Sequence, residues 1–159
     1  HDSHRRQRQM CIRDRILKET SKRHEKLKNK AEETESGLKY HVTKSGNGIK
    51  VDENKVILTH YAVYFEDGRL LDTSVLEIAE KFNMVNIQRK NANGYTPIEA
   101  KVGPKDMMIS GFKEGLKLLN VGDKAILYIP YYLAYGEMEN RGIPAKSNLI
   151  FEVEIVDQL

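Results

Sequence analysis

One short amphipathic segment, residues 108–119, limits the folds open to this chain more than any other stretch. Phe112, Leu116 and Leu119 recur at i, i+4 and i+7, which is the spacing of the apolar side of a helix. Gly115 lies in the middle of this helix, where glycine costs roughly 1 kcal/mol relative to alanine. We therefore expect another element to pack against the helix backbone too closely for a β-carbon.

Almost all of the sequence after residue 37 has the patterns of strands and turns. Residues 56–63 are partly apolar on both faces, which predicts a central strand, and residues 149–156 alternate cleanly. One short helix cannot form a helical core, so it must fill the concave face of a single sheet. The sequence thus predicts an α+β fold. Ile109 and Phe112 stand where strand gives way to helix, a usual place for the floor of a pocket.

Three segments lie outside this sheet pattern. Residues 75–96 have helical spacing followed by a turn, which predicts an inserted helix and loop at the rim of the sheet. Residues 16–36 are good helix formers with charges of alternating sign, so we expect a solvent-exposed charged linker helix or a disordered tether. Residues 1–15 lack periodicity and are interpreted as a non-native leader. The folded domain is then residues 37–159.

The charge distribution argues against several classes of function. The net charge is +3, but residues 1–36 hold 11 Lys and Arg against 7 Asp and Glu, so the domain itself is close to neutral. A nucleic-acid-binding protein would need a basic face on the domain. No apolar run approaches the ~20 residues of a membrane span, and the single Cys11 excludes a disulfide framework. The compartment stays open: cytoplasmic by default, or cell envelope if the true N-terminus is missing.

Several motifs follow one another along the domain in a fixed order and spacing. They are residues 59–61 (THY), 66–68 (EDG), 71–74 (LDTS), 109–116 (ISGFKEGL), 121–124 (VGDK), 129–130 (IP), 133–136 (LAYG), 143–144 (IP) and 149–154 (LIFEVE). In this order the chain resembles the bacterial type of the FK506-binding-protein (FKBP) family of peptidyl-prolyl cis/trans isomerases, over about residues 37–159. The resemblance implies a curved antiparallel β-sheet wrapped around one short α-helix.

The resemblance also assigns roles to residues at matching positions. It implies catalytic roles for Asp72, Tyr135 and Ile109. The positions that line the family's proline pocket are Tyr61, Leu71, Ile98, Met108, Phe112, Ile143 and Phe151. Leu71 and Ile98 stand where an aromatic residue is usual, and Phe112 stands where many members carry tryptophan. The pocket is therefore less aromatic than the family pattern, which implies weakened binding of macrolide drugs.

Isomerisation of an X–Pro bond requires no nucleophile, metal or cofactor. Its barrier of ~18–20 kcal/mol reflects the loss of amide resonance. A dry apolar pocket stabilises the twisted, less polar amide, and the Tyr135 hydroxyl and the Ile109 N–H are the candidate donors to substrate. The sequence therefore predicts an isomerase that acts on proline-containing polypeptides during folding.

Two other interpretations remain open. The departures at Leu71, Ile98 and Phe112 favour a non-catalytic module that binds proline segments or acts as a chaperone. The segment 16–36 resembles the linker found before this fold in bacterial proteins that join a cyclophilin domain to it, so a further N-terminal domain is compatible with either function. His60 is interpreted as a structural residue of the sheet, because no Ser/His/Asp or Cys/His pattern accompanies it.

Overall fold

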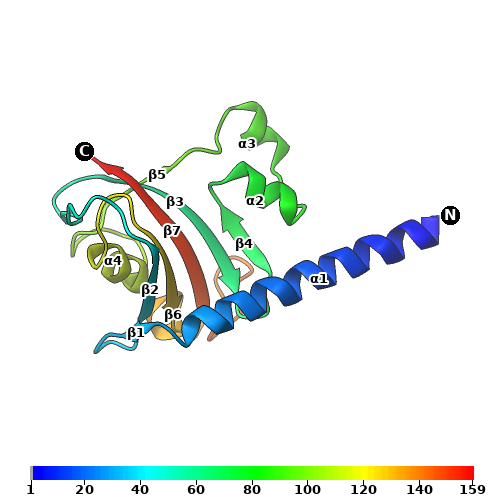
Figure 1. Cartoon of the computed structure of the whole chain (residues 1–159), viewed down its shortest axis with the longest axis horizontal. Helices are drawn as coiled ribbons and strands as arrows, with labels where there is room; N and C mark the ends of the chain where they lie inside the picture. Colours follow the sequence, from blue (N-terminus) through cyan, green and yellow to red (C-terminus); the bar gives the residue numbers. More distant parts are fainter. Residues whose placement is uncertain (1) are drawn as a thin grey trace.

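A computed structural model describes residues 2–159 (Figure 1). Within that range seven strands form one curved antiparallel sheet in the order β1-β2-β6-β7-β3-β4, with β5 paired to β3. The strands are β1 (Glu32–Glu33), β2 (Lys39–Lys44), β3 (Ile57–Phe65), β4 (Leu70–Thr73), β5 (Ile98–Ala100), β6 (Lys124–Ile129) and β7 (Leu149–Gln158). Strand β3 pairs with β4, β5 and β7, so the central strand predicted from its two apolar faces is confirmed.

The concave face of the sheet holds helix α4 (Ser110–Lys117) and the larger apolar core (Figure 1). An ideal β-carbon on Gly115 would lie 2.5 Å from Leu127 Cδ1 of β6, and one on Gly111 would collide with Ile129 of the same strand. Real carbon atoms do not approach so closely, so the helix backbone lies directly against the side chains of Leu127 and Ile129. The close approach expected at Gly115 is therefore confirmed.

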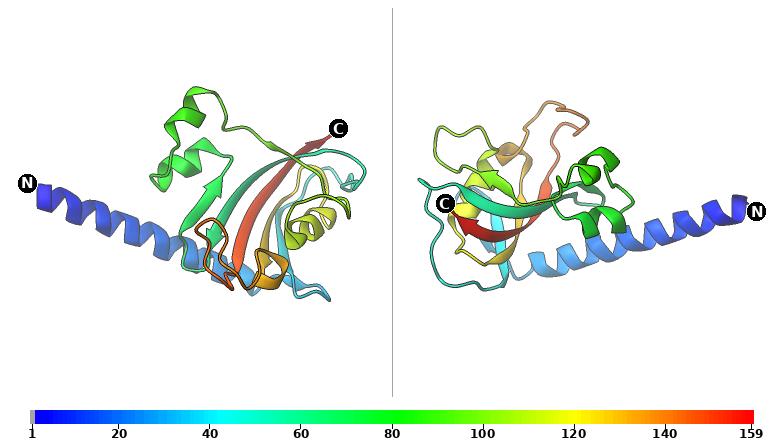
Figure 2. Two further views of the ribbon diagram at one scale, coloured as in Figure 1. Left: turned by 180° about the vertical axis from the view of Figure 1, so that it is seen from behind. Right: turned by 90° about the horizontal axis from the view of Figure 1, so that it is seen from above.

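The convex face carries the second half of helix α1 (Asp2–Lys28), which corrects the prediction for residues 16–36 (Figure 2). The helix begins and ends earlier than predicted, and it is not fully solvated. Thr20 and His24 are only 6% and 1% exposed, so α4 is not the only helix that buries side chains against the sheet. The prediction failed because these buried residues are polar, and a count of apolar positions does not register them.

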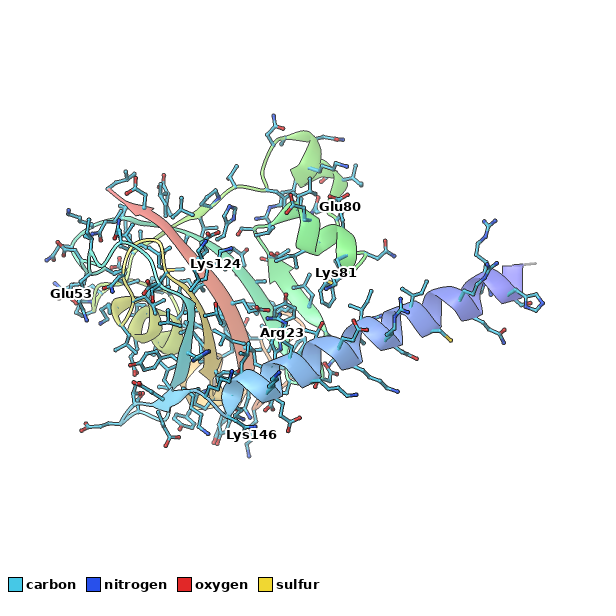
Figure 3. All side chains as sticks on the ribbon, viewed as in Figure 1. Arg23, Glu53, Glu80, Lys81, Lys124 and Lys146 are labelled. Carbon is cyan, nitrogen blue, oxygen red and sulfur yellow. The ribbon has the colours of Figure 1, made fainter. Side chains whose placement is uncertain are left out.

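A carboxylate on β7 anchors helix α1. Arg23, which is labelled in Figure 3, donates to the two oxygens of Glu152 at 2.8 and 2.5 Å. His24 Nε2 lies 3.1 Å from Glu152 Oε2. Burial would raise the pKa of Glu152, but the hydrogen bonds with His24 and Arg23 lower it to about 2. The Tyr128 hydroxyl also donates to the carbonyl of His24. The helix is therefore held by specific polar contacts.

The first half of α1 projects away from the sheet in Figures 1 and 2. The described side chains of residues 3–15 are exposed. The interpretation of residues 1–15 as a non-native leader stays a prediction. Within the described range, 2–159, no helix combines the length and the apolar composition needed to cross a bilayer.

The insert forms two short helices, where the sequence predicted one helix and a loop. They are α2 (Leu76–Lys81) and α3 (Ile87–Asn91), and the first is followed by Asn83, whose φ of 54° lies in the left-handed region. Such a residue cannot continue a right-handed helix. Ile78 and Phe82 pack against the smaller apolar cluster of the convex face. The insert lies beside edge strand β4 (Figure 2), so its predicted place at the rim is confirmed.

Candidate active site

An aromatic pair forms the apolar floor of the candidate site. Phe112 extends from α4 and Phe151 from β7, and their ring centroids lie 5.2 Å apart with the planes tilted by 46°. The two residues are 2% and 8% exposed. Phe151 pairs with Val63 of β3 on one side and Leu127 of β6 on the other. The helix and the central strands therefore fix both rings.

Five more residues from the predicted site pack against the same apolar core as this pair. They are Tyr61, Leu71, Ile98, Met108 and Ile109, and each is half-buried. They come from β3, β4, β5 and the segment before α4, so the strands of one sheet edge and the start of the helix converge on the floor. The structure thus gathers most of the predicted apolar residues in one place.

Ile109 occupies the position directly before α4, with φ −59° and ψ 143°. Its carbonyl accepts a hydrogen bond from the Lys113 N–H at 3.1 Å, which begins the helix. No backbone hydrogen bond among the described residues uses the Ile109 N–H. Amide groups at a helix start lack an intrahelical partner, so this N–H can donate to a carbonyl placed over the floor.

A tyrosine and an aspartate form the polar rim of the site. The Tyr61 hydroxyl donates to Asp72 Oδ2 at 2.5 Å, and Asp72 Oδ1 accepts from the Thr73 N–H at 2.8 Å. Burial first and the hydrogen bond to Asp72 second raise the pKa of Tyr61, and the nearby Arg89 opposes them, with a net result of about 12. The phenol of Tyr61 therefore stays protonated at neutral pH and keeps donating to the carboxylate.

The structure does not bring Tyr135 and Ile143 into the same apolar core. Both lie in the long connection between β6 and β7. Ile143 is 7% exposed and follows a tight turn in which Arg141 and Gly142 have φ of 47° and 83°. Tyr135 is 41% exposed, and no hydrogen bond among the described residues uses its hydroxyl. Its role as a donor to substrate stays a prediction.

A histidine and a serine lie close together near this rim without forming a nucleophile. His60 Nδ1 lies 2.9 Å from Ser74 Oγ, and the same oxygen accepts from the Tyr61 N–H at 2.8 Å. Ser74 is 0% exposed, so a substrate cannot reach it. The contact links β3 to the end of β4, which agrees with the interpretation of His60 as a structural residue.

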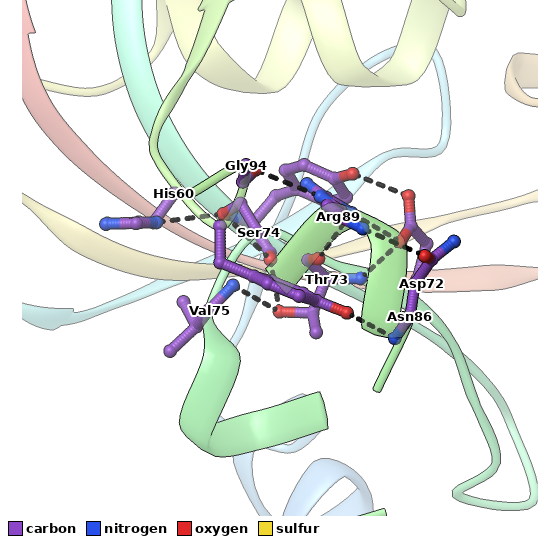
Figure 4. A network of polar contacts seen from close by, with 10 residues as sticks. His60, Asp72, Thr73, Ser74, Val75, Asn86, Arg89 and Gly94 are labelled. Carbon is purple, nitrogen blue, oxygen red and sulfur yellow. Dashed lines mark hydrogen bonds and ion pairs between the residues drawn. The ribbon is translucent and has the colours of Figure 1, made fainter. Parts of the chain in front are cut away.

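One residue at the rim, Arg89, was missed by the sequence analysis. Its Nη1 lies 3.4 Å from Asp72 Oδ1 and 3.1 Å from the carbonyl oxygen of Thr73 (Figure 4). Arg89 comes from α3, far from Asp72 in the sequence. On a polar helix, the neighbouring sequence does not distinguish an arginine that points to a site from one that points to solvent. Only the three-dimensional structure shows the contact of Arg89 with Asp72.

Comparison with known sequences decides the assignment. A sequence model described as FKBP-type peptidyl-prolyl cis-trans isomerase matches residues 47–156, a range that contains every predicted site residue. The chain belongs to this family. The sequence motifs and the matched range of residues therefore indicate the same family.

Curated FKBP-type relatives are longer than this chain. The isomerase FkpA of Aeromonas hydrophila is 34% identical over 123 residues, which cover 77% of this chain and 38% of that protein. FkpA of Escherichia coli K12 is 33% identical over 131 residues, which cover 82% of this chain and 41% of that protein. The chain thus spans less than half the length of these relatives.

Solved structures confirm the FKBP fold. The crystal structure of FkpA from Escherichia coli matches with a TM-score of 0.64 and 26% identity, over 94% of this chain and 63% of that one. A peptidyl-prolyl cis-trans isomerase from Pseudomonas syringae matches with a TM-score of 0.64 and 25% identity, over 89% of this chain and 90% of that one. The predicted α+β fold, a curved antiparallel sheet around one short helix, is confirmed.

Proposed function

We propose that this chain catalyses the cis/trans isomerisation of X–Pro bonds in polypeptides. The observation that carries the proposal is the buried pair Phe112 and Phe151 beside the hydrogen-bonded Tyr61 and Asp72. An uncatalysed X–Pro bond exchanges over tens to hundreds of seconds, because rotation breaks amide resonance. An apolar floor favours the twisted amide, which has lost charge separation, over either planar form.

The polar groups around the floor act on the substrate carbonyl and on the local field. The Ile109 N–H is a backbone donor fixed by the start of α4, so it costs no reorganisation when the amide twists. The exposed Tyr135 hydroxyl is the second donor in this proposal. Asp72 is held beside Tyr61 and sets the charge at the rim. No proton is transferred and no covalent bond is formed in this mechanism.

A protease-coupled assay on a panel of X–Pro peptides tests the proposal. We expect catalytic amounts of the chain to shorten the slow phase of cis-to-trans conversion, with the rate proportional to protein concentration. The matched control is the double variant Tyr135→Phe and Asp72→Asn, which keeps the fold and removes two polar groups. A wild-type chain that accelerates none of the peptides would contradict the proposal and favour a non-catalytic proline-binding module.

Two exposed apolar side chains on the insert support a second role in binding unfolded chains. Ile87 is 62% exposed and Met84 is 48% exposed, and both belong to the segment between α2 and the end of α3. Replacing both by serine should lower the refolding yield of a protein substrate and leave peptide turnover unchanged. Equal refolding yields for the wild type and this variant would contradict the second role.

Macrolide binding is proposed to be weak, because Leu71 and Ile98 offer aliphatic surface at the half-buried edge of the site. Aromatic side chains bury a larger area than aliphatic ones and add ring contacts. Leu71→Phe should therefore tighten macrolide binding measured by titration calorimetry. Unchanged affinity would show that Leu71 does not touch the ligand.

A further inference from the structure

We propose, on the basis of the isomerase function above, that Arg89 of the insert is a positioning residue that holds Asp72 in its place beside Tyr61. The guanidinium spans the gap between α3 and β4 and meets Asp72 Oδ1 at 3.4 Å (Figure 4). The insert therefore belongs to the candidate site through this one side chain. Packing of the insert against β4 therefore also orients the carboxylate of Asp72.

Groups other than Asp72 also fix the guanidinium. Arg89 Nε donates to the carbonyl oxygen of Gly94 at 3.0 Å, and Nη1 donates to that of Thr73 at 3.1 Å. The guanidinium carbon lies 4.5 Å from the ring centroid of Tyr95, a cation–π contact. The planar guanidinium is thus held through two of its nitrogen atoms and through one face, so the side chain has little rotational freedom. These contacts fix the guanidinium without any contribution from the carboxylate.

The segment that carries Arg89 is built around it. Asn86 Oδ1 accepts the Arg89 N–H at 3.0 Å, and the Tyr95 hydroxyl accepts the Asn86 N–H at 2.9 Å. A β-carbon on Gly94 would lie 2.8 Å from Arg89 Cγ, so glycine makes room for the side chain. Helix α3 has no buried residue of its own. A helix that only packed for stability would bury an apolar side chain, whereas this one places an arginine.

The consequence for Asp72 is a fixed orientation of an exposed carboxylate. Its side chain is 55% exposed, so solvent alone would let it rotate. Arg89 and the Thr73 N–H hold Oδ1, which leaves Oδ2 for the hydroxyl of Tyr61. Lysine could supply the charge but not the fork of donors, because an ammonium group is a compact point charge.

Arg69 provides a matched control for the variant Arg89→Met. Arg69 also pairs with an aspartate, Asp67, at 2.7 Å, and lies 4.7 Å from the ring centroid of Phe65, but in the turn between β3 and β4. We expect Arg89→Met to lower kcat/KM for an X–Pro peptide about three- to tenfold, mainly through kcat, and Arg69→Met to change it less than about twofold. Arg89→Lys should recover less than half of the loss.

A double-mutant cycle with Asp72→Asn separates positioning from general stability. If Arg89 acts through Asp72, the double variant is no slower than Asp72→Asn alone. Additive losses, or full activity in Arg89→Met, would overturn the inference. Urea denaturation shows whether Arg89→Met folds. If it does not, Arg89→Lys takes its place in the double-mutant cycle.

A structural readout keeps this inference separate from the proposed function. The amide resonance of Thr73 should shift in Arg89→Met and stay in place in Arg69→Met, because the Thr73 N–H donates to Asp72 Oδ1. A wild-type chain without isomerase activity would contradict the proposed function alone. An unmoved Thr73 resonance in Arg89→Met would overturn the positioning role, whatever the activity.

Discussion

The two faces of the sheet are covered in different ways. The concave face packs α4 through apolar side chains and two glycines that let the backbone touch β6. The convex face holds α1 through Arg23, His24 and Glu152, around a smaller apolar cluster. Close packing of side chains therefore holds the helix on the concave face, and hydrogen bonds to a charged carboxylate hold the helix on the convex face. The first should therefore respond to changes of volume, and the second to changes of pH.

Removal of a ring from the concave face should give the largest effect. Phe112→Ala leaves a cavity beside Phe151 and should cost roughly 3–5 kcal/mol of unfolding free energy, measured by urea denaturation. Val156→Ala on β7, at a residue 44% exposed, is the control and should stay within about 0.5 kcal/mol. A loss below about 1 kcal/mol for Phe112→Ala would show that the face is not held by packing.

Acid should weaken the convex face next. The pKa of Glu152 falls from 4.5 to about 2 on folding, so its stabilising contribution is fully present above about pH 4.5 and is lost as the pH falls towards 2. The wild type should lose roughly 2–3 kcal/mol of stability from this group over that window. Urea melts at several pH values measure the loss. The same loss in Glu152→Gln would assign it to another group.

At neutral pH, Glu152→Gln should cost about 1–3 kcal/mol of unfolding free energy, because it removes the charge and one of the two acceptor oxygens that face Arg23 and His24. Glu154→Gln is the matched control two residues along β7. Its carboxylate meets Lys124 only at 3.9 Å and at 42% exposure, so its loss should be near zero. Equal losses for the two variants would remove the distinction between the anchor and an ordinary surface pair.

A smaller effect is expected from Tyr135→Phe, which keeps the ring and removes one donor. A fully used transition-state donor is worth about 2.7–4 kcal/mol in strong cases. At 41% exposure Tyr135 should contribute less, so kcat/KM should fall between several-fold and about tenfold. The stability of the variant should equal that of the wild type. Full activity would exclude Tyr135 as a donor to substrate.

The smallest expected effect is that of pH on catalysis. The isomerisation rate should be nearly flat between about pH 6 and 9, because no proton moves in the mechanism. Tyr61, with its pKa raised to about 12, stays protonated over that range. Rates for one peptide in a constant-ionic-strength buffer series measure this. A bell-shaped profile would indicate acid–base chemistry, which the proposed mechanism, stabilisation of the twisted amide on an apolar floor, does not contain.

The concave face could be predicted because packing against a sheet leaves a period in the sequence. Phe112, Leu116 and Leu119 recur at helical spacing, and all three are buried. Gly115 broke the helical preference, and the cause is its contact with Leu127. Local pattern and tertiary structure agree wherever apolar area alone decides which side of an element is buried.

The convex face and the polar rim could not be predicted, because each depends on a partner distant in the sequence. The buried His24 has as its side-chain partner Glu152 on the last strand, 128 residues further along the chain. Arg89 of α3 meets Asp72 of β4, a partner 17 residues earlier in the chain. A sequence shows that such residues are polar, but it does not show which of them will meet.

Phe151 and Glu152 are neighbours on β7 and face opposite sides of the sheet, because side chains alternate along a strand. Deletion of one residue just before them would move the carboxylate into the apolar core and the aromatic ring towards α1. A single-residue length change in β7 before Phe151 therefore cannot satisfy both faces. The turn at 140–143 carries no such double requirement, so a change of length there leaves both faces of β7 in place.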